Sequence, residues 1–111
     1  MDLQQVFTTV TSSLLNQGAP SIDNDGSCCY RGPGQLKCAL GHLIPDANYT
    51  PEIEGYSLSH QSVVQRLPFP VPVDSRLYEL LQQLQSIHDA EDVSQWPESF
   101  AGIATEYGLT I

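Results

Sequence analysis

Regular spacing of large apolar residues is the feature of this sequence that most restricts its fold. After Asp74, such residues recur three and four positions apart, which places them on one face of an α-helix: Leu77, Leu80, Leu81, Leu84 and Ile87. Asp74 is the expected N-cap, and the helix is expected to run to about Ala90. The pattern therefore predicts a mostly α-helical fold.

Both ends of the chain carry the same helical spacing. Near the N-terminus, Asp2 is the expected N-cap, Gln5 follows three residues later, and Gly18 ends the helix. The apolar residues of this helix are Leu3, Val6, Phe7, Val10, Leu14 and Leu15. A last helix is expected from about Gln95, and Gly108 is typical of a helix end of the Schellman type. Its apolar residues are Trp96, Phe100, Ile103, Ala104 and Tyr107.

The middle of the chain is interrupted by proline and glycine, which break regular structure. The elements expected there are, in order, a surface loop over 19–27, a short strand or hairpin around 28–36, a short helix over 36–44, one helical turn after Pro51, a short helix over 59–67 and an extended connector over 68–73. Phe69 and Val71 are expected to pack the connector on the core. The strand makes an α+β fold the alternative, in a single domain over 1–111.

Acidic residues dominate the charge of the chain. Thirteen acids stand against four bases, and the net charge is -9 at pH 7. A phosphate backbone or an anionic membrane would be repelled, so we expect no direct nucleic acid binding and no membrane association. The excess of acid either keeps the protein soluble or presents carboxylates to a basic protein surface, and charge alone does not separate these two interpretations.

Three cysteines, Cys28, Cys29 and Cys38, are an odd number with two adjacent members, which fits poorly with a secreted disulfide framework. The N-terminus has no signal-peptide pattern, and no run of about 18 apolar residues occurs. We therefore expect reduced thiols and a cytoplasmic location, either as a monomer or as a homo-oligomer.

A local excess of positive charge marks the stretch 26–44, which holds two of the four bases, no acid and several glycines. A glycine-rich turn exposes backbone N–H groups, and flanking bases would complete a site for a phosphate or carboxylate. The Walker A ending is absent, and we predict no cofactor. The candidate ligand-binding residues are Tyr30, Arg31, Gly32, Gly34, Lys37 and His88. The alternative is a structural turn whose bases are solvated or form salt bridges.

Two further groups of residues could carry chemistry. Weak zinc candidates are Cys29, Cys38 and His42, with Cys28 or His88 as a fourth ligand, although no Cys-x2-Cys pair supports them and buried thiols are the simpler interpretation. A protein-binding role is the alternative for the acids around Tyr49, which are Asp46, Glu52 and Glu54. His88 and Asp89 are either a helix end that compensates the dipole or an imidazole beside its orienting carboxylate.

The order of many of these residues resembles a family of small proteins from tailed bacteriophages, prophages and some bacteria. The matching residues cover nearly the whole chain: Cys28, Tyr30-Arg31-Gly32-Pro33, Leu36-Lys37-Cys38-Ala39, Gly41, Leu43-Ile44-Pro45-Asp46, Tyr49, Glu54-Gly55, Leu84-Gln85, Ile87-His88-Asp89 and Trp96. The chain departs from the family at Gly34-Gln35, where an acidic or amide residue followed by glycine is more usual. The resemblance implies no particular activity, but it suggests a phage accessory protein in the host cytoplasm.

Three functions follow as hypotheses, and the residues favour a binding protein over an enzyme. The first is a counter-defence protein that sequesters a small anionic, nucleotide-like host signal, with Arg31 and Lys37 on its phosphates and Tyr30 stacked on a base. The second is an acidic inhibitor that docks on a basic, nucleic-acid-binding surface of a host defence complex. The third is a zinc-dependent or thiol-dependent enzyme.

Overall fold

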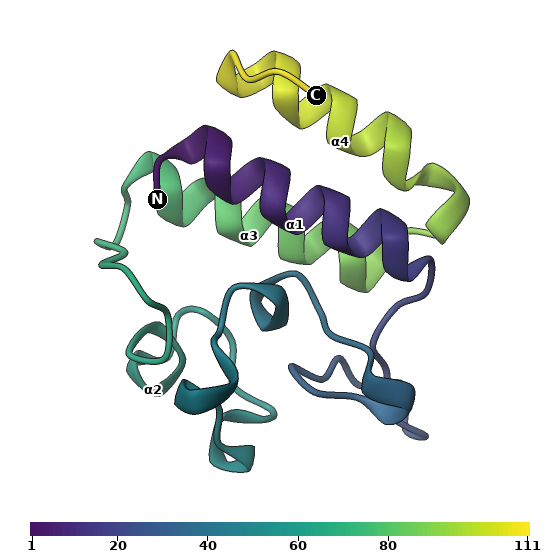
Figure 1. The fold of residues 1–111 in the computed structure, drawn as a ribbon, viewed down its shortest axis with the longest axis vertical. Helices are drawn as coiled ribbons and strands as arrows, with labels where there is room; N and C mark the ends of the chain where they lie inside the picture. Colours follow the sequence, from purple (N-terminus) through teal and green to yellow (C-terminus); the bar gives the residue numbers. More distant parts are fainter.

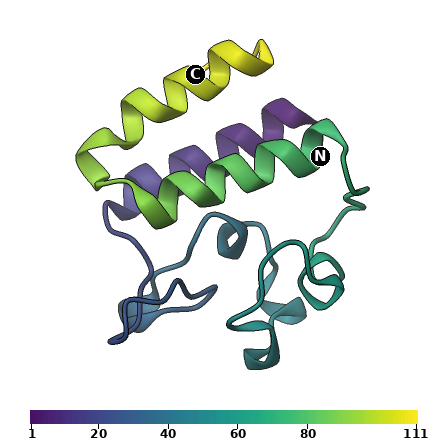
Figure 2. The ribbon, with the colours of Figure 1, turned by 180° about the vertical axis from the view of Figure 1, so that it is seen from behind.

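The computed structural model describes residues 1–111. It is built from helices and loops and contains no β-strand. Three long helices form one layer: α1 (Leu3–Gln17), α3 (Arg76–Ala90) and α4 (Trp96–Tyr107). Figure 1 shows α1 beside α3 with α4 lying along both, and Figure 2 shows the same arrangement from behind. Residues 18–75 form a second layer beneath, which we call the loop layer. The mostly α fold is therefore confirmed.

The loop layer holds only short helical turns. They are the α-helix α2 (Gln61–Val64) and the 3₁₀ turns Pro33–Gln35, Leu40–His42, Asp46–Asn48 and Pro51–Ile53, while a further 3₁₀ turn, Val93–Gln95, leads into α4. The connector after α2 forms neither helix nor strand and bends at 67–69, while Val71 is buried and Phe69 packs against the core as expected. None of the helices has both the length and the apolar composition needed to cross a bilayer.

Four residues were predicted to begin or end the long helices, and three of these predictions are confirmed. Asp2 accepts from the Gln5 amide at 2.8 Å, and the Gln5 side chain accepts from the Asp2 amide, which completes a capping box. Gly18 and Gly108 both end their helices in the left-handed conformation. The predicted cap of α3 is wrong by one residue, because Ser75 accepts from the Tyr78 amide and Asp74 has a φ of 66°.

Two expected elements of the middle segment are wrong, and side chains from elsewhere explain both. The helix over 36–44 shrinks to the 3₁₀ turn Leu40–His42, because Gln17 of α1 accepts from the Lys37 amide and Gln85 of α3 from the Leu40 amide. The short strand or hairpin expected around 28–36 is reduced to one bridge between Ile22 and Cys28. Glu54 accepts from the amides of Tyr30 and Arg31, which a strand partner would otherwise bind.

One hydrophobic core joins the two layers. The helical layer contributes the apolar faces of α1, α3 and α4, including the fully buried Trp96. The loop layer contributes residues that cover the lower face of these helices: Cys38, Ala39, Leu40, Leu43, Ile44, Ile53, Leu58, Val63, Leu67 and Val71. Packing against the long helices therefore stabilises the loop layer, in addition to the hydrogen bonds of its own turns.

Candidate functional site

Glu54 organises the stretch that carried most of the predicted ligand residues. Its Oε1 accepts from the Tyr30 amide at 2.9 Å, and its Oε2 accepts from the Arg31 amide at 3.1 Å and from the Tyr49 hydroxyl at 2.7 Å. A carboxylate that accepts three hydrogen bonds inside the fold has little capacity left for a partner. Glu54 is therefore a structural residue of the loop layer.

The guanidinium of Arg31 is also bound to other groups of the fold. Nη1 donates to the carbonyl of Gly41 at 2.8 Å and to its neighbour's carbonyl at 3.1 Å, while Nη2 donates to the carbonyl of Ile44 at 2.8 Å. Nη2 also pairs with Asp46 at 2.9 Å, and the guanidinium lies 4.8 Å from the centre of the Tyr49 ring. The Arg31 side chain is 19% exposed. These contacts match the alternative interpretation, in which the basic stretch is a structural turn.

The position of Tyr30 does not favour its predicted stacking role. Its side chain is 6% exposed, and its hydroxyl donates to the carbonyl of Tyr56 at 2.5 Å. Burial raises the pKa of Tyr30. The ring is part of the core, and little of its surface is open to a nucleobase.

Three of the predicted ligand residues do line one polar hollow of about 560 Å³. Arg31, Gly32 and Lys37 surround it together with Gln35 and Asp46. Lys37 lies 3.9 Å from Asp46 and makes no hydrogen bond through its side chain. Gly34, which has a φ of 69°, does not line this hollow, and His88 lies elsewhere, at the end of α3.

The acids predicted to bind a partner do not share one free surface. Asp46 is paired with Arg31 and Lys37, and Glu54 is held by the amides described above. Glu52 is exposed and forms no ion pair. Of the three, only Glu52 presents an unengaged carboxylate.

The weak zinc candidates do not converge. Cys38 is fully buried, and the Cys29 thiol donates to the carbonyl of Ser27 at 3.5 Å in an exposed turn. His42 contacts Gln17 Oε1 at 3.1 Å, and burial together with the nearby bases lowers its pKa to about 4. These three side chains serve the fold separately.

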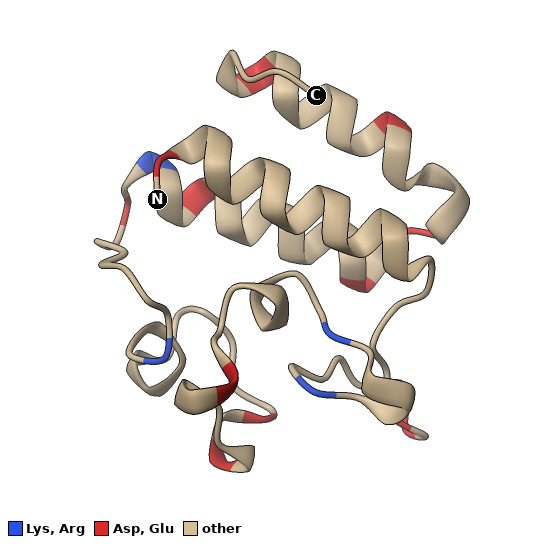
Figure 3. Ribbon diagram, viewed as in Figure 1, with Lys and Arg blue, Asp and Glu red and all other residues tan.

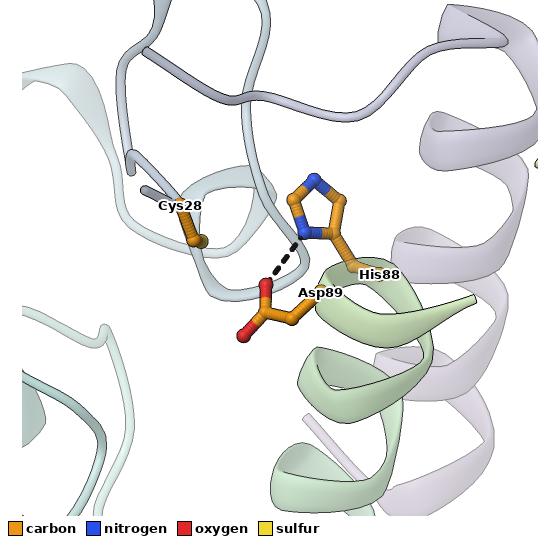
Figure 4. Close-up of side chains that lie close together, drawn as sticks. All are labelled: Cys28, His88 and Asp89. Carbon is orange, nitrogen blue, oxygen red and sulfur yellow. Dashed lines mark hydrogen bonds and ion pairs between the residues drawn. The ribbon is translucent and has the colours of Figure 1, made fainter. Parts of the chain in front are cut away.

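A different cluster, which joins a thiol, an imidazole and a carboxylate, lies where the loop layer meets the end of α3. The ligand atoms of Cys28, His88 and Asp89 lie within 4.8 Å of one another (Figure 4). His88 is buried, its Nδ1 lies 2.8 Å from Asp89 Oδ1, and its Nε2 accepts from the Ser21 amide at 2.9 Å. Gln85 Nε2 donates to Asp89 Oδ1 at 2.8 Å and to the Cys28 sulfur at 3.0 Å.

The hydrogen bond from the Ser21 amide determines the protonation state of His88. Burial disfavours the charged form of His88, whereas hydrogen bonds with Asp89 and Cys28 favour it and raise its pKa above the usual value. Protonation would nevertheless set an N–H on Nε2 against the Ser21 N–H, so this contact holds His88 neutral with its proton on Nδ1. A metal ion on Nδ1 would require the same unfavourable arrangement, and the donor set therefore does not fit a metal.

Cys28 is not an activated nucleophile. A hydrogen bond with the neighbouring Cys38 and burial raise the pKa of the Cys28 thiol. Reactive cysteines need a lowered pKa, because the thiolate is the species that attacks. His88 cannot act as its base through Nε2, which already accepts from the Ser21 amide.

A wide groove runs between α3 and α4 and holds about 680 Å³. Three carboxylates, four other polar side chains, one glycine and two isoleucines line it: Glu79, Gln82, Gln83, Ser86, Ile87, Glu91, Ser99, Gly102, Ile103 and Glu106. None of its glutamates forms an ion pair with a lysine or arginine. The sequence predicted both helices, but not that their polar faces would meet along one groove.

Comparison with known proteins finds no matching family model, no similar curated protein and no similar solved structure. The resemblance to small phage proteins therefore stays a prediction.

Proposed function

We propose that this chain is a non-enzymatic binding protein that docks the acidic face of its helical layer on a basic surface of a partner protein. The charge distribution is the observation that supports the proposal. Residues 1–18 and 74–111 hold eight of the thirteen acids but only one of the four bases. Figure 3 shows the remaining bases in the loop layer, away from α1 and α4.

Three exposed glutamates of the helical layer, Glu79, Glu91 and Glu106, line the groove between α3 and α4. The one base of the helical layer, Arg76, lies 5.0 Å from the centre of the Tyr107 ring and 3.5 Å from the Tyr107 carbonyl, so it does not neutralise the groove. Glu91 and Glu106 accept from Ser99 and Gln83, which orients both carboxylates. Uncompensated, oriented carboxylates attract lysine and arginine side chains.

A surface that binds nucleic acid is the kind of basic surface that fits best, because carboxylates can occupy the positions of phosphates. Together with the resemblance to phage proteins, this favours inhibition of a nucleic-acid-handling host complex. No catalytic group is required for this function.

Neutralising two groove carboxylates tests the proposal. With octalysine as the probe, affinity is expected to fall roughly tenfold between 50 and 300 mM salt, because charge attraction is screened. The variant Glu79→Gln/Glu91→Gln is expected to bind about fivefold more weakly than the wild type at 50 mM salt. Fluorescence anisotropy of labelled octalysine measures both effects.

The matched control is Asp25→Asn/Glu52→Gln, which removes the same charge from exposed positions of the loop layer. It is expected to change the affinity by less than about twofold, since only long-range attraction is lost. Equal weakening by both pairs, or binding that ignores salt, would contradict a docking surface on the helical layer.

A small anion is the second candidate partner, because Arg31, Gly32 and Lys37 line one hollow. Lys37 is the side chain to change. Its ammonium forms no hydrogen bond within the fold, and its only ion-pair partner, Asp46, lies 3.9 Å away. If the hollow binds anions, Lys37→Glu should reduce pyrophosphate affinity by about tenfold or more without loss of folding. Calorimetry with pyrophosphate measures this, and an unchanged affinity would remove the hollow as a site.

A further inference from the structure

Asp89 lies where three hollows meet, between α3 and the loop layer. The largest, of about 370 Å³, is lined in part by Cys28, Leu40, Tyr56 and Leu58. Hollows of about 160 Å³ and 320 Å³ adjoin it on either side, and Asp89 lines all three. The acidic groove contains none of these four side chains, although Gln82 and Ser86 line both the groove and the hollow of about 320 Å³.

The carboxylate of Asp89 is held in one orientation. His88 Nδ1 and Gln85 Nε2 both donate to its Oδ1, each at 2.8 Å, and neither reaches Oδ2. Burial opposes ionisation, but the hydrogen bonds from His88, Cys28 and Gln85 lower the pKa of Asp89. At neutral pH the side chain is therefore a fixed anion with one oxygen free to accept, and it is 42% exposed.

No basic side chain of the chain compensates this anion. Its only ion-pair partner is His88, which the Ser21 amide holds in the neutral form. The surroundings are largely uncharged, since Cys28 is a neutral thiol and Leu40 and Leu58 supply apolar surface. A carboxylate beside apolar surface is a suitable environment for a cation that carries a hydrophobic body.

We propose that the cleft around Asp89 binds a small organic cation with an aromatic or aliphatic body. Its ammonium or amidinium group donates to Oδ2 of Asp89, and its body lies against Leu40, Leu58 and the Tyr56 ring. The volume of about 370 Å³ is at the small end of ligand pockets, which suits a molecule of one or two rings. Asp89 does not line the acidic groove, and the site does not depend on a protein partner.

Benzamidine and benzamide test this proposal, because the two molecules have nearly the same shape but only benzamidine is charged. Wild-type protein is expected to bind benzamidine at least about tenfold more tightly than benzamide, through the charge-assisted bond to Oδ2. Titration followed by two-dimensional NMR measures both affinities and shows whether the shifts gather at Cys28, Leu58 and Gln85. Equal affinities, or shifts confined to the groove between α3 and α4, would overturn the proposal.

Asp89→Asn supplies the second test, since an asparagine Oδ1 can still accept from His88 and Gln85 while its amide nitrogen replaces Oδ2. Benzamidine affinity is expected to fall about tenfold or more in this variant. Asp92→Asn is the matched control, because it removes the same charge three residues away and asparagine can keep the cap on Ser94. Equal losses in both variants would reduce the effect to general charge attraction and refute the site. If Asp89→Asn does not fold, the comparison of the two probes on wild-type protein still decides.

Discussion

Replacement of Arg31 by methionine is expected to lower the free energy of unfolding by about 3–5 kcal/mol, which is a large part of the stability of a domain of this size. Methionine keeps the length of the apolar stem but makes none of the four hydrogen bonds of the guanidinium. The carbonyls of Gly41 and Ile44 then lose their charged donor in a half-buried part of the loop layer. Urea denaturation followed by circular dichroism measures the change.

Arg31→Lys gives the graded control, since one ammonium cannot reach both carbonyls and the Asp46 carboxylate in the same geometry. We expect a loss of about 2 kcal/mol, between the wild type and the methionine variant. A loss below about 1 kcal/mol for Arg31→Met would show that the network contributes little. A ligand-binding test that reverses the charge of Arg31 would therefore measure unfolding rather than recognition.

The second large effect is expected at Gly41, where Gly41→Ala should destabilise the protein by about 2–4 kcal/mol. A Cβ atom at this position would lie 2.5 Å from the Tyr30 carbonyl oxygen and 3.2 Å from the Lys37 Cβ. The oxygen belongs to backbone, so it cannot rotate away. Thermal and urea unfolding are expected to show the loss together.

Gly102 is the matched control for this substitution. It lies inside α4, and a Cβ atom there would meet nothing within 4 Å. Gly102→Ala is therefore expected to stabilise the protein by about 0.5–1 kcal/mol, through helix propensity alone. The two glycines should thus give changes of opposite sign, and destabilisation of similar size at both would contradict the steric argument.

The sequence predicted the helical layer well, because α1, α3 and α4 depend on local patterns. Their apolar spacing, the Asp2 capping box and the glycine ends are all encoded within a few residues of each helix. The loop layer was predicted poorly, since its backbone amides bond to side chains far away along the chain. Gln17, Glu54 and Gln85 accept from amides 20 to 45 residues distant, and no local pattern reveals such pairs.

The same reason limits what could be said about the candidate sites. Adjacency of His88 and Asp89 in the sequence suggested an imidazole oriented by a carboxylate, and the structure shows that contact. The sequence could not show that Gln85 would hold the same carboxylate oxygen, or that Ser21 would occupy the far side of the imidazole. Both contacts depend on the packing of the loop layer against α3.

The long-range acceptors also bear on how the native state opens. The amides of Tyr30, Arg31, Lys37 and Leu40 are protected by side chains rather than by a backbone ladder. Deuterium can therefore reach the amides of Lys37 and Leu40 when the loop layer lifts from Gln17 and Gln85, with α1 and α3 still intact. Exchange at these two sites would report the free energy of that partial opening, which is also the motion that would widen the cleft around Asp89.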